Sequence, residues 1–388
     1  MHYLDASFIK TKIQADRLKL ADELKILFSK RAAKHDEEAT FPFDNFDNLK
    51  EYGFTHLTVP KKYGGKELSL YEFLQIQERI AQGDAATALS LGWHLGIIMN
   101  LRETNKWPQG LFEKVCKEII TENKLINSAA TEPRSGSPAR GGKPETTAEL
   151  INNRWVLNGK KTYASLAPAL DYFIITATII ESGSVAEFLV SKGAEGLKIE
   201  ETWDTLGMRA TRSDDLILTN VTVEKEALIG TREKAGKPKP QGWLLHIPAC
   251  YVGVAMAARN EAIQFSKDYQ PNSANHPICE FPEVQQKIAL MEIELMTTRQ
   301  FMYSTAERWD QANKEERERM GTDLAAVKYV ATNSSVKVVD LAMRIVGAHS
   351  LSKSSPMQRY YRDVRAGLHN PPADEMTLKV LAKRALGS

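Results

Sequence analysis

The stretch Ser128–Gly142 (Ser-Ala-Ala-Thr-Glu-Pro-Arg-Ser-Gly-Ser-Pro-Ala-Arg-Gly-Gly) constrains the fold of this chain more than any other. Its prolines, Pro133 and Pro138, have no backbone N–H to donate, and its glycines permit positive φ angles, so it cannot form a regular helix or strand. The sequence before it has helical periodicity, and the sequence after it alternates between apolar and polar residues. The stretch is therefore either a plain surface turn between two domains or a turn whose hydroxyls and amides bind an anion or a planar ring edge.

Periodicity divides the chain into three predicted domains. Residues 1–125 are predicted to form a helical domain, 126–232 a small antiparallel β domain, and 241–388 a four-helix bundle. The short strands favour a β-barrel or sandwich, and they do not alternate with helices as in a parallel nucleotide-binding fold. The Lys- and Pro-rich segment Gly230–Gln241 is predicted to be a linker. The expected fold class is α+β and multidomain.

Charge and cysteine content narrow the range of partners and compartments. The 388 residues include 51 Lys and Arg against 49 Asp and Glu, so no strong field for nucleic acid or an acidic membrane is expected. The three cysteines lie far apart and match neither a disulfide framework nor a metal site. No apolar run has the length of a membrane span, and the N-terminus does not resemble a signal peptide. We therefore expect a cytoplasmic protein that binds no nucleic acid, membrane or metal.

Two more motifs follow the first in order. They are Asn158–Ser165 (Asn-Gly-Lys-Lys-Thr-Tyr-Ala-Ser) and Leu206–Ser213 (Leu-Gly-Met-Arg-Ala-Thr-Arg-Ser). Together with Thr131–Ser137, their order and spacing resemble the flavin-binding middle domain of acyl-CoA dehydrogenases. The similarity extends along nearly all of the chain, as far as Arg359–Asp363 (Arg-Tyr-Tyr-Arg-Asp). The resemblance implies the fold of that family.

The resemblance also implies that FAD lies between the β domain and the bundle, with an acyl thioester against the flavin. Convergent hydroxyls and amides would stabilise the negative charge of the reduced flavin. The implied cofactor-binding residues are Ala129 and Thr131 at the edge of the ring, Gly136 and Ser137 at the pyrophosphate, Tyr163 against the ring, and Ser165 near the reactive ring nitrogen.

The usual catalytic base of the family is missing. In acyl-CoA dehydrogenases a glutamate removes the α-proton while the β-hydrogen leaves as hydride to the flavin. Ungapped alignment from Arg362–Asp363 places Pro371-Pro372-Ala373 at that point, and proline can neither take a proton nor donate a backbone hydrogen bond. The candidate catalytic residues nearby are His369 and Asp374, and His246 is a weaker one. His369 could equally be a satisfied turn histidine, and Asp374 suits the first turn of the last helix.

His94 lies among apolar residues in a predicted helix, Ala85–Leu101. A single histidine on an apolar face is usually a satisfied core residue. The resemblance implies that this helix lines the acyl pocket, so we expect His94 to be a substrate-pocket residue without a chemical role.

The favoured function is FAD-dependent α,β-dehydrogenation of an acyl-CoA in fatty acid metabolism. The expected partners are the acyl-CoA substrate, an electron-transferring flavoprotein, and further copies of the chain in a dimer or tetramer. The first alternative is a two-component flavin-dependent monooxygenase, because such relatives commonly have a histidine where the glutamate segment lies. The second is a non-catalytic flavin-binding scaffold, because the glutamate is absent.

Overall fold

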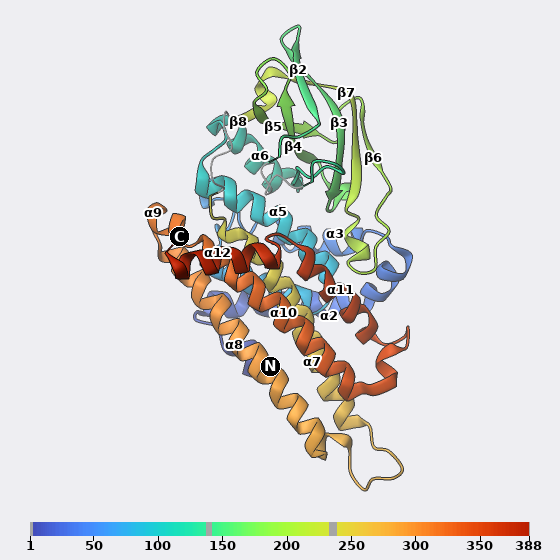
Figure 1. The fold of residues 1–388 in the computed structure, drawn as a ribbon. Coiled ribbons are helices and arrows are strands. Elements are labelled where there is room, and N and C mark those ends of the chain that lie inside the picture. The colour runs from blue at the N-terminus through green and yellow to red at the C-terminus, as the bar shows by residue number, and fades with distance from the viewer. Residues whose placement is uncertain (1–2, 137–141, 233–238, 388) are drawn as a thin grey trace.

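The computed structural model describes residues 3–136, 142–232 and 239–387, and its first part is helical (Figure 1). Ser69 precedes the helix Leu70–Ala81 and forms reciprocal capping hydrogen bonds with Glu72 in its first turn. The Asp84 carboxylate accepts hydrogen bonds from the first amides of the next helix. These helices of the N-terminal part are α1 (Tyr3–Ala6), α2 (Lys12–Glu38), α3 (Phe43–Glu51), α4 (Leu70–Ala81), α5 (Ala85–Thr104) and α6 (Gln109–Glu122).

The middle part is one eight-stranded sheet with the order β6-β7-β3-β2-β4-β5-β8, in which β1 pairs with β4. Most neighbours are antiparallel, but β4 runs parallel to both β1 and β2. The sheet differs in this respect from the predicted antiparallel domain, because β2 and β3 lie between β1 and β4 along the chain and provide a crossover. Its strands are β1 (Ile126–Ala129), β2 (Thr147–Ile151), β3 (Arg154–Ala164), β4 (Tyr172–Ile179), β5 (Val185–Ser191), β6 (Leu197–Glu200), β7 (Asp214–Glu224) and β8 (Leu228–Arg232).

The C-terminal part is a helical bundle. Helix α10 packs against α7, α8 and α11, while α8 and α11 also contact α7. The predicted four-helix bundle is therefore present, and its last member is divided by the turn at 370–373. Residues 233–238, the middle of the predicted linker, lie outside the described residues. The bundle helices are α7 (His246–Asp268), α8 (Pro282–Gln311), α9 (Lys314–Arg319), α10 (Gly321–Val346), α11 (Pro356–His369) and α12 (Asp374–Leu386).

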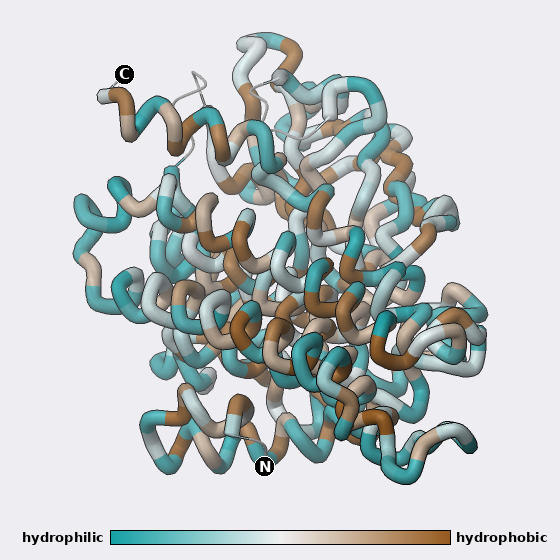
Figure 2. Tube along the Cα trace, turned by 60° about the horizontal axis from the view of Figure 1, so that its bottom comes forward, coloured by the Kyte–Doolittle hydropathy of each residue, from teal (hydrophilic) through white to brown (hydrophobic). Residues whose placement is uncertain are grey.

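Helices from the first part join the bundle beneath the sheet (Figure 1). Both α4 and α5 pack against α7, and α5 also contacts β1. Hydrophobic and hydrophilic residues alternate along the outer helices, as expected for helices that bury one face (Figure 2). None of the described helices is long and apolar enough to cross a membrane. Helix α5 thus packs against both the sheet and the bundle.

Candidate functional site

The second and third motifs form two strained turns. Four large side chains in these turns, one of them directly after the second motif, have positive φ angles, which such residues rarely adopt. A conformation of this kind costs about 1–3 kcal/mol and persists where the surroundings enforce it, often at functional sites. The four residues are Tyr163 (φ 58), Leu166 (φ 54), Met208 (φ 55) and Arg212 (φ 42).

The two turns bring three buried hydroxyls into a row. Ser165 Oγ lies 2.9 Å from Ser213 Oγ, which lies 2.9 Å from Thr211 Oγ1. Thr211 Oγ1 is also 2.9 Å from the Met208 carbonyl oxygen. Asn127 of β1 donates from Nδ2 to the Ser165 carbonyl oxygen at 3.2 Å, so the row lies beside β1. Sequence reasoning placed Ser165 at a site but assigned no role to Ser213, Thr211 or Asn127, although Thr211 and Ser213 belong to the third motif.

Glu132 holds the first loop to the sheet. Its carboxylate accepts hydrogen bonds from Lys161 Nζ at 2.6 Å, from Thr146 Oγ1 at 2.6 Å and from Ser135 Oγ at 2.5 Å. Burial favours the neutral acid, but these donors outweigh it and lower the pKa of Glu132 to about 2. The loop is therefore fixed by a buried ion pair whose two partners come from the first and second motifs.

The predicted residues of the first loop lie close to the second motif. Ala129 is the last residue of β1, and the Thr131 carbonyl oxygen accepts a hydrogen bond from Thr162 N at 2.9 Å. Gly136 has φ 70, which glycine adopts readily, and its backbone exchanges hydrogen bonds with that of Glu132 at 3.0 and 3.2 Å. Ser137, the other residue predicted at the pyrophosphate, lies outside the described residues.

Tyr163 presents its ring at the surface. The residue is 62% exposed, and its ring meets that of Trp203 edge-on, with 5.9 Å between centroids. The main chain of Trp203 is held by Asp214 Oδ1, which accepts from its backbone N at 3.0 Å. The ring of Tyr163 is thus exposed for stacking with a planar ligand.

The third motif connects the sheet with the bundle and the first part. A Cβ at Gly207 would lie 2.3 Å from the Arg362 carbonyl oxygen, so only glycine permits this approach to α11. Met208 N donates to Asp363 Oδ1 at 2.6 Å, and Arg209 Nε donates to the Asp36 carbonyl oxygen at 2.8 Å. Burial raises the pKa of Asp363 to about 7, although the hydrogen bond from Met208 opposes this. The contacts explain why a Leu-Gly motif and an Arg-Asp motif occur together.

His94 is fully buried between backbone groups. Its Nδ1 accepts from Ile126 N at 3.1 Å, so Nε2 carries the proton and donates to the Thr55 carbonyl oxygen at 3.0 Å. Burial lowers the pKa of His94 to about 4, against the effect of these hydrogen bonds. This is the geometry of a satisfied core histidine that ties β1 to α5, and it does not support the expected place of His94 in the substrate pocket.

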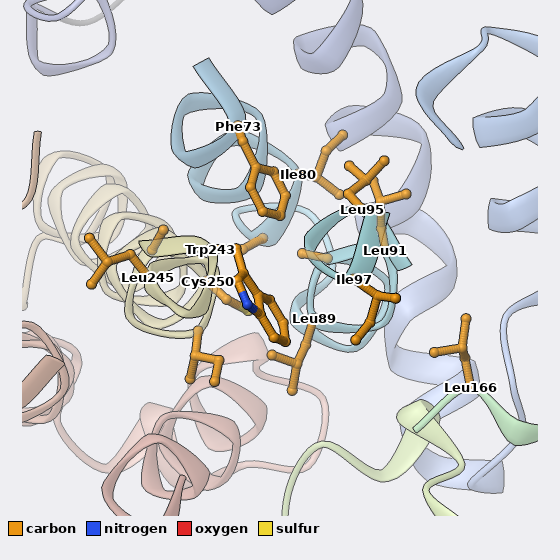
Figure 3. Close-up of a cluster of buried hydrophobic side chains, with 14 of the residues drawn as sticks. Phe73, Ile80, Leu89, Leu91, Leu95, Ile97, Leu166, Trp243, Leu245 and Cys250 are labelled. Atoms are coloured by element: carbon orange, nitrogen blue, oxygen red, sulfur yellow. The ribbon is translucent and has the colours of Figure 1, made fainter. Parts of the chain in front are cut away.

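A cluster of buried apolar side chains lies between α5 and the beginning of the bundle (Figure 3). Figure 3 shows the Trp243 side chain extending from the beginning of the bundle toward Leu89, with Leu166 of the second turn also near α5. A Cβ at Gly96 of α5 would lie 2.3 Å from Trp243 Cε3, so the indole lies directly on the α5 backbone. The neighbouring His246 is fully buried, and neither ring nitrogen has a hydrogen-bond partner within the described residues.

The two candidate catalytic residues have different surroundings. Asp374, the first residue of α12, accepts from Lys328 Nζ at 3.2 Å and from Asn333 Nδ2 at 3.0 Å, both on α10. His369 ends α11 and is exposed. Nearby, Tyr251 of α7 donates its hydroxyl proton to Asn370 Oδ1 at 2.8 Å and anchors the turn between the two helices. Asp374 thus has hydrogen-bond partners that explain its position, whereas His369 has no hydrogen bond to another side chain among the described residues.

The residues present fit a flavin. An isoalloxazine needs hydrogen-bonding groups along one edge and an apolar wall against the ring, and a pyrophosphate needs open backbone amides. Here the edge is provided by the hydroxyl row and the end of β1, and the wall by the exposed ring of Tyr163. The amide of Gly136 is not open, because it donates to the Glu132 carbonyl oxygen at 3.0 Å, so the described residues provide the ring edge and the wall alone.

Comparison with known proteins agrees with this geometry. The acyl-CoA dehydrogenase N-terminal, middle and C-terminal domain models match residues 20–105, 127–221 and 245–370. Over 370 residues, 95% of both chains, the sequence is 46% identical to YdbM of Bacillus subtilis (strain 168), provisionally named an acyl-CoA dehydrogenase. Over 361 residues it is 30% identical to the 3-(aryl)acrylate reductase of Clostridium sporogenes (strain ATCC 15579), covering 90% of this chain and 92% of that one.

The fold matches that of a solved structure. Butyryl-CoA dehydrogenase from Megasphaera elsdenii superposes with a TM-score of 0.86 at 23% identity, covering 97% of this chain and 99% of that one. The predicted family and fold class are thereby confirmed. The chain belongs to the acyl-CoA dehydrogenase family, whose members are flavin-binding oxidoreductases that act on CH–CH bonds.

Proposed function

We propose that this chain catalyses the FAD-dependent α,β-dehydrogenation of an acyl-CoA thioester, in which Cα loses a proton and Cβ a hydride. Family membership supports the type of reaction. The observation that carries the proposal is the buried row of hydroxyls formed by Ser165, Ser213 and Thr211 beside the end of β1. Such a row is suited to the edge of a flavin ring, where charge develops during the reaction.

Each predicted cofactor residue has a distinct proposed task. Bound FAD would supply the hydride acceptor. The backbone at Ala129 and Thr131 would meet the edge of the ring, and Gly136 with Ser137 would meet the pyrophosphate. Tyr163 would stack on the ring, and Ser165 would direct its hydroxyl at the reactive nitrogen. Trp243, seated on α5, would exclude water from the side nearest the bundle.

An anaerobic titration tests the reaction. The purified protein is expected to be yellow, and its flavin absorbance should bleach when a matching acyl-CoA is added without oxygen. A panel of short, branched, aryl and long thioesters covers the acyl classes, and the matching free acids serve as controls for the need for CoA. The absence of bleaching across the whole panel, in protein that holds oxidised flavin, would contradict the proposed reaction.

His369 is the base that we propose, because it is exposed beside the turn where the family glutamate usually lies, whereas Asp374 is bonded to α10. The His369→Asn variant should lose about 10²–10⁴-fold in turnover, the usual contribution of a general base, while its flavin stays bound. The Asp374→Asn variant is the matched control and should retain most of the turnover. Full turnover in His369→Asn would exclude the assignment.

The two-component monooxygenase remains a second candidate, favoured by an exposed His369 next to a Pro371-Pro372 turn that offers no carboxylate. A protein of this kind should purify largely colourless and bind reduced flavin more tightly than oxidised flavin. The scaffold alternative would hold flavin without responding to acyl-CoA or to oxygen.

The assembly and the electron acceptor are also proposals. Three exposed apolar residues on α8, Leu290, Ile293 and Met296, support an association of bundles into a dimer or tetramer. An electron-transferring flavoprotein is the acceptor that suits a dehydrogenase. The location that we propose is the cytoplasm, in keeping with three free cysteines.

A further inference from the structure

We propose that Ser165, Ser213 and Thr211 act as a reversible hydroxyl relay. The relay lets Ser165 donate a hydrogen bond to the oxidised flavin and accept one from the reduced flavin. The inference rests on the proposed function, because it places Ser165 beside the reactive ring nitrogen. It goes further by assigning Ser213 and Thr211 as positioning residues.

The three hydroxyls are shielded from water, and the row they form ends at the Met208 carbonyl oxygen. The exposed fractions are 8% for Ser165, 5% for Ser213 and 1% for Thr211. The two hydroxyl–hydroxyl distances are both 2.9 Å, and Thr211 Oγ1 is also 2.9 Å from the Met208 carbonyl oxygen. Each hydroxyl has one proton and can accept two hydrogen bonds, so the row has two complete hydrogen-bond arrangements.

In the first arrangement the protons point toward the site. Thr211 donates to Ser213, Ser213 donates to Ser165, and Ser165 donates to a ring nitrogen that carries a lone pair, as in oxidised flavin. The Met208 carbonyl oxygen does not then depend on Thr211 Oγ1, because Trp203 Nε1 donates to it at 3.0 Å and Thr211 N at 3.1 Å.

In the second arrangement the protons point away from the site. Ser165 accepts from a ring nitrogen that carries hydrogen, as in reduced flavin, and itself donates to Ser213. Ser213 then donates to Thr211, and Thr211 donates to the Met208 carbonyl oxygen. The change requires only rotation of the three hydroxyls, so no covalent bond breaks and no proton leaves the row.

The relay matters because, without Ser213, the Ser165 hydroxyl would have no hydrogen-bond acceptor in the second arrangement. A buried donor without an acceptor destabilises the state in which it occurs. Without Ser213 this cost would arise only when Ser165 accepts from the ring, since Ser165 donates to the ring in the first arrangement. Ser213 and Thr211 are therefore expected to favour the reduced flavin over the oxidised flavin.

The experiment compares the affinity of the protein for oxidised and reduced FAD, together with the two-electron midpoint potential of the bound flavin. In the Ser213→Ala variant the preference for reduced FAD should fall about tenfold, which corresponds to a potential lower by about 30 mV. Thr211→Val, which keeps the shape of the side chain, should have the same sign of effect. The double variant should show less than the sum of the two, because both changes interrupt one row.

The controls keep a hydroxyl at each position. Ser213→Thr and Thr211→Ser should stay near the wild-type ratio, whereas a purely structural role would make all four single variants change with their melting temperatures. If Ser213→Ala and Thr211→Val bind FAD with a wild-type ratio and potential, the relay is wrong even when acyl-CoA bleaches the flavin. If the ratio shifts as expected but no acyl-CoA bleaches the wild-type protein, the proposed reaction fails and the relay stands. A wild-type protein that binds no FAD would overturn both.

Discussion

Glu132→Ala is expected to destabilise the folded protein by about 3–5 kcal/mol, because it leaves the buried ammonium of Lys161 without its partner. The side chains of Glu132 and Lys161 are 1% and 0% exposed, and their charged atoms are 2.6 Å apart. The change also removes the acceptor for the backbone amides of Glu145 and Thr146. Urea denaturation of the wild type and the variant measures the loss, and flavin content after purification should fall with it.

Two further variants test whether the buried ion pair accounts for that loss of stability. Arg134 pairs with Glu145 in the same loop, but their side chains are 85% and 53% exposed, so Arg134→Ala should cost less than about 1 kcal/mol. The double variant Glu132→Met/Lys161→Met should recover part of the loss, since it removes both buried charges. If Glu132→Ala cost no more than Arg134→Ala, the buried pair would not be what holds the loop.

The same pair has a pH dependence. The folded pKa of Glu132 is about 2, below the unfolded value of 4.5, so the unfolded chain takes up its proton first on acidification. Its contribution to stability is complete above about pH 4.5 and disappears as the pH falls toward 2. The Glu132→Ala variant should therefore approach the wild type in stability within this range of pH.

His246→Phe is expected to make the protein more resistant to acid, by about 3 kcal/mol near pH 4. Burial among aromatic rings lowers the pKa of His246 from 6.5 to about 3. Because the folded pKa is depressed, the stabilising effect of the neutral ring is present above pH 6.5 and is lost as the pH falls. Each pKa unit is worth about 1.4 kcal/mol, and some 2.5 units separate 6.5 from 4.

A comparison of variants separates the effect of His246 on acid stability from that of groups, such as Asp363, whose effect has the opposite sign. Asp363, with its raised pKa, gains stability over much of the same range, so total pH profiles mix several residues. The measurement is the difference in free energy of unfolding between wild type and His246→Phe at about pH 7 and about pH 4. His276→Gln, at a side chain that is 44% exposed, is the control for replacing a histidine outside the core. A difference that does not grow toward acid would contradict the prediction.

Local sequence was sufficient to predict the helices, the strands and a flavin as the cofactor. The change of period around residue 126 and the helical repeats after residue 241 arise from neighbouring residues, and they predicted the helical and β parts of the chain. The three motifs also indicated the family, because each combines glycine with hydroxyls at a fixed place between elements. The directions of the strands were harder to predict from sequence, since β4 pairs in parallel with β1 and β2 only after the chain crosses over.

The site was predicted in part for the same reason. Ser165 was identified from its motif, but its hydrogen-bond partner Ser213 lies 48 residues away. His94 was assigned to a pocket because the resemblance implies that its helix lines the acyl pocket, whereas its hydrogen-bond partners, Thr55 and Ile126, lie 39 and 32 residues away. No local pattern contains these pairings.

The sequence by itself determined the order of the three parts, the caps and turns that divide them, and the hydroxyl and glycine residues available for a flavin, because these depend on short-range backbone preferences. Tertiary structure alone decided which hydroxyls form hydrogen bonds with one another and which histidines are buried in the neutral form. It also decided that Gly207 contacts α11. Those outcomes depend on distant segments approaching within hydrogen-bond distance, which requires positive φ at residues such as Tyr163 and Met208 that do not favour it by themselves.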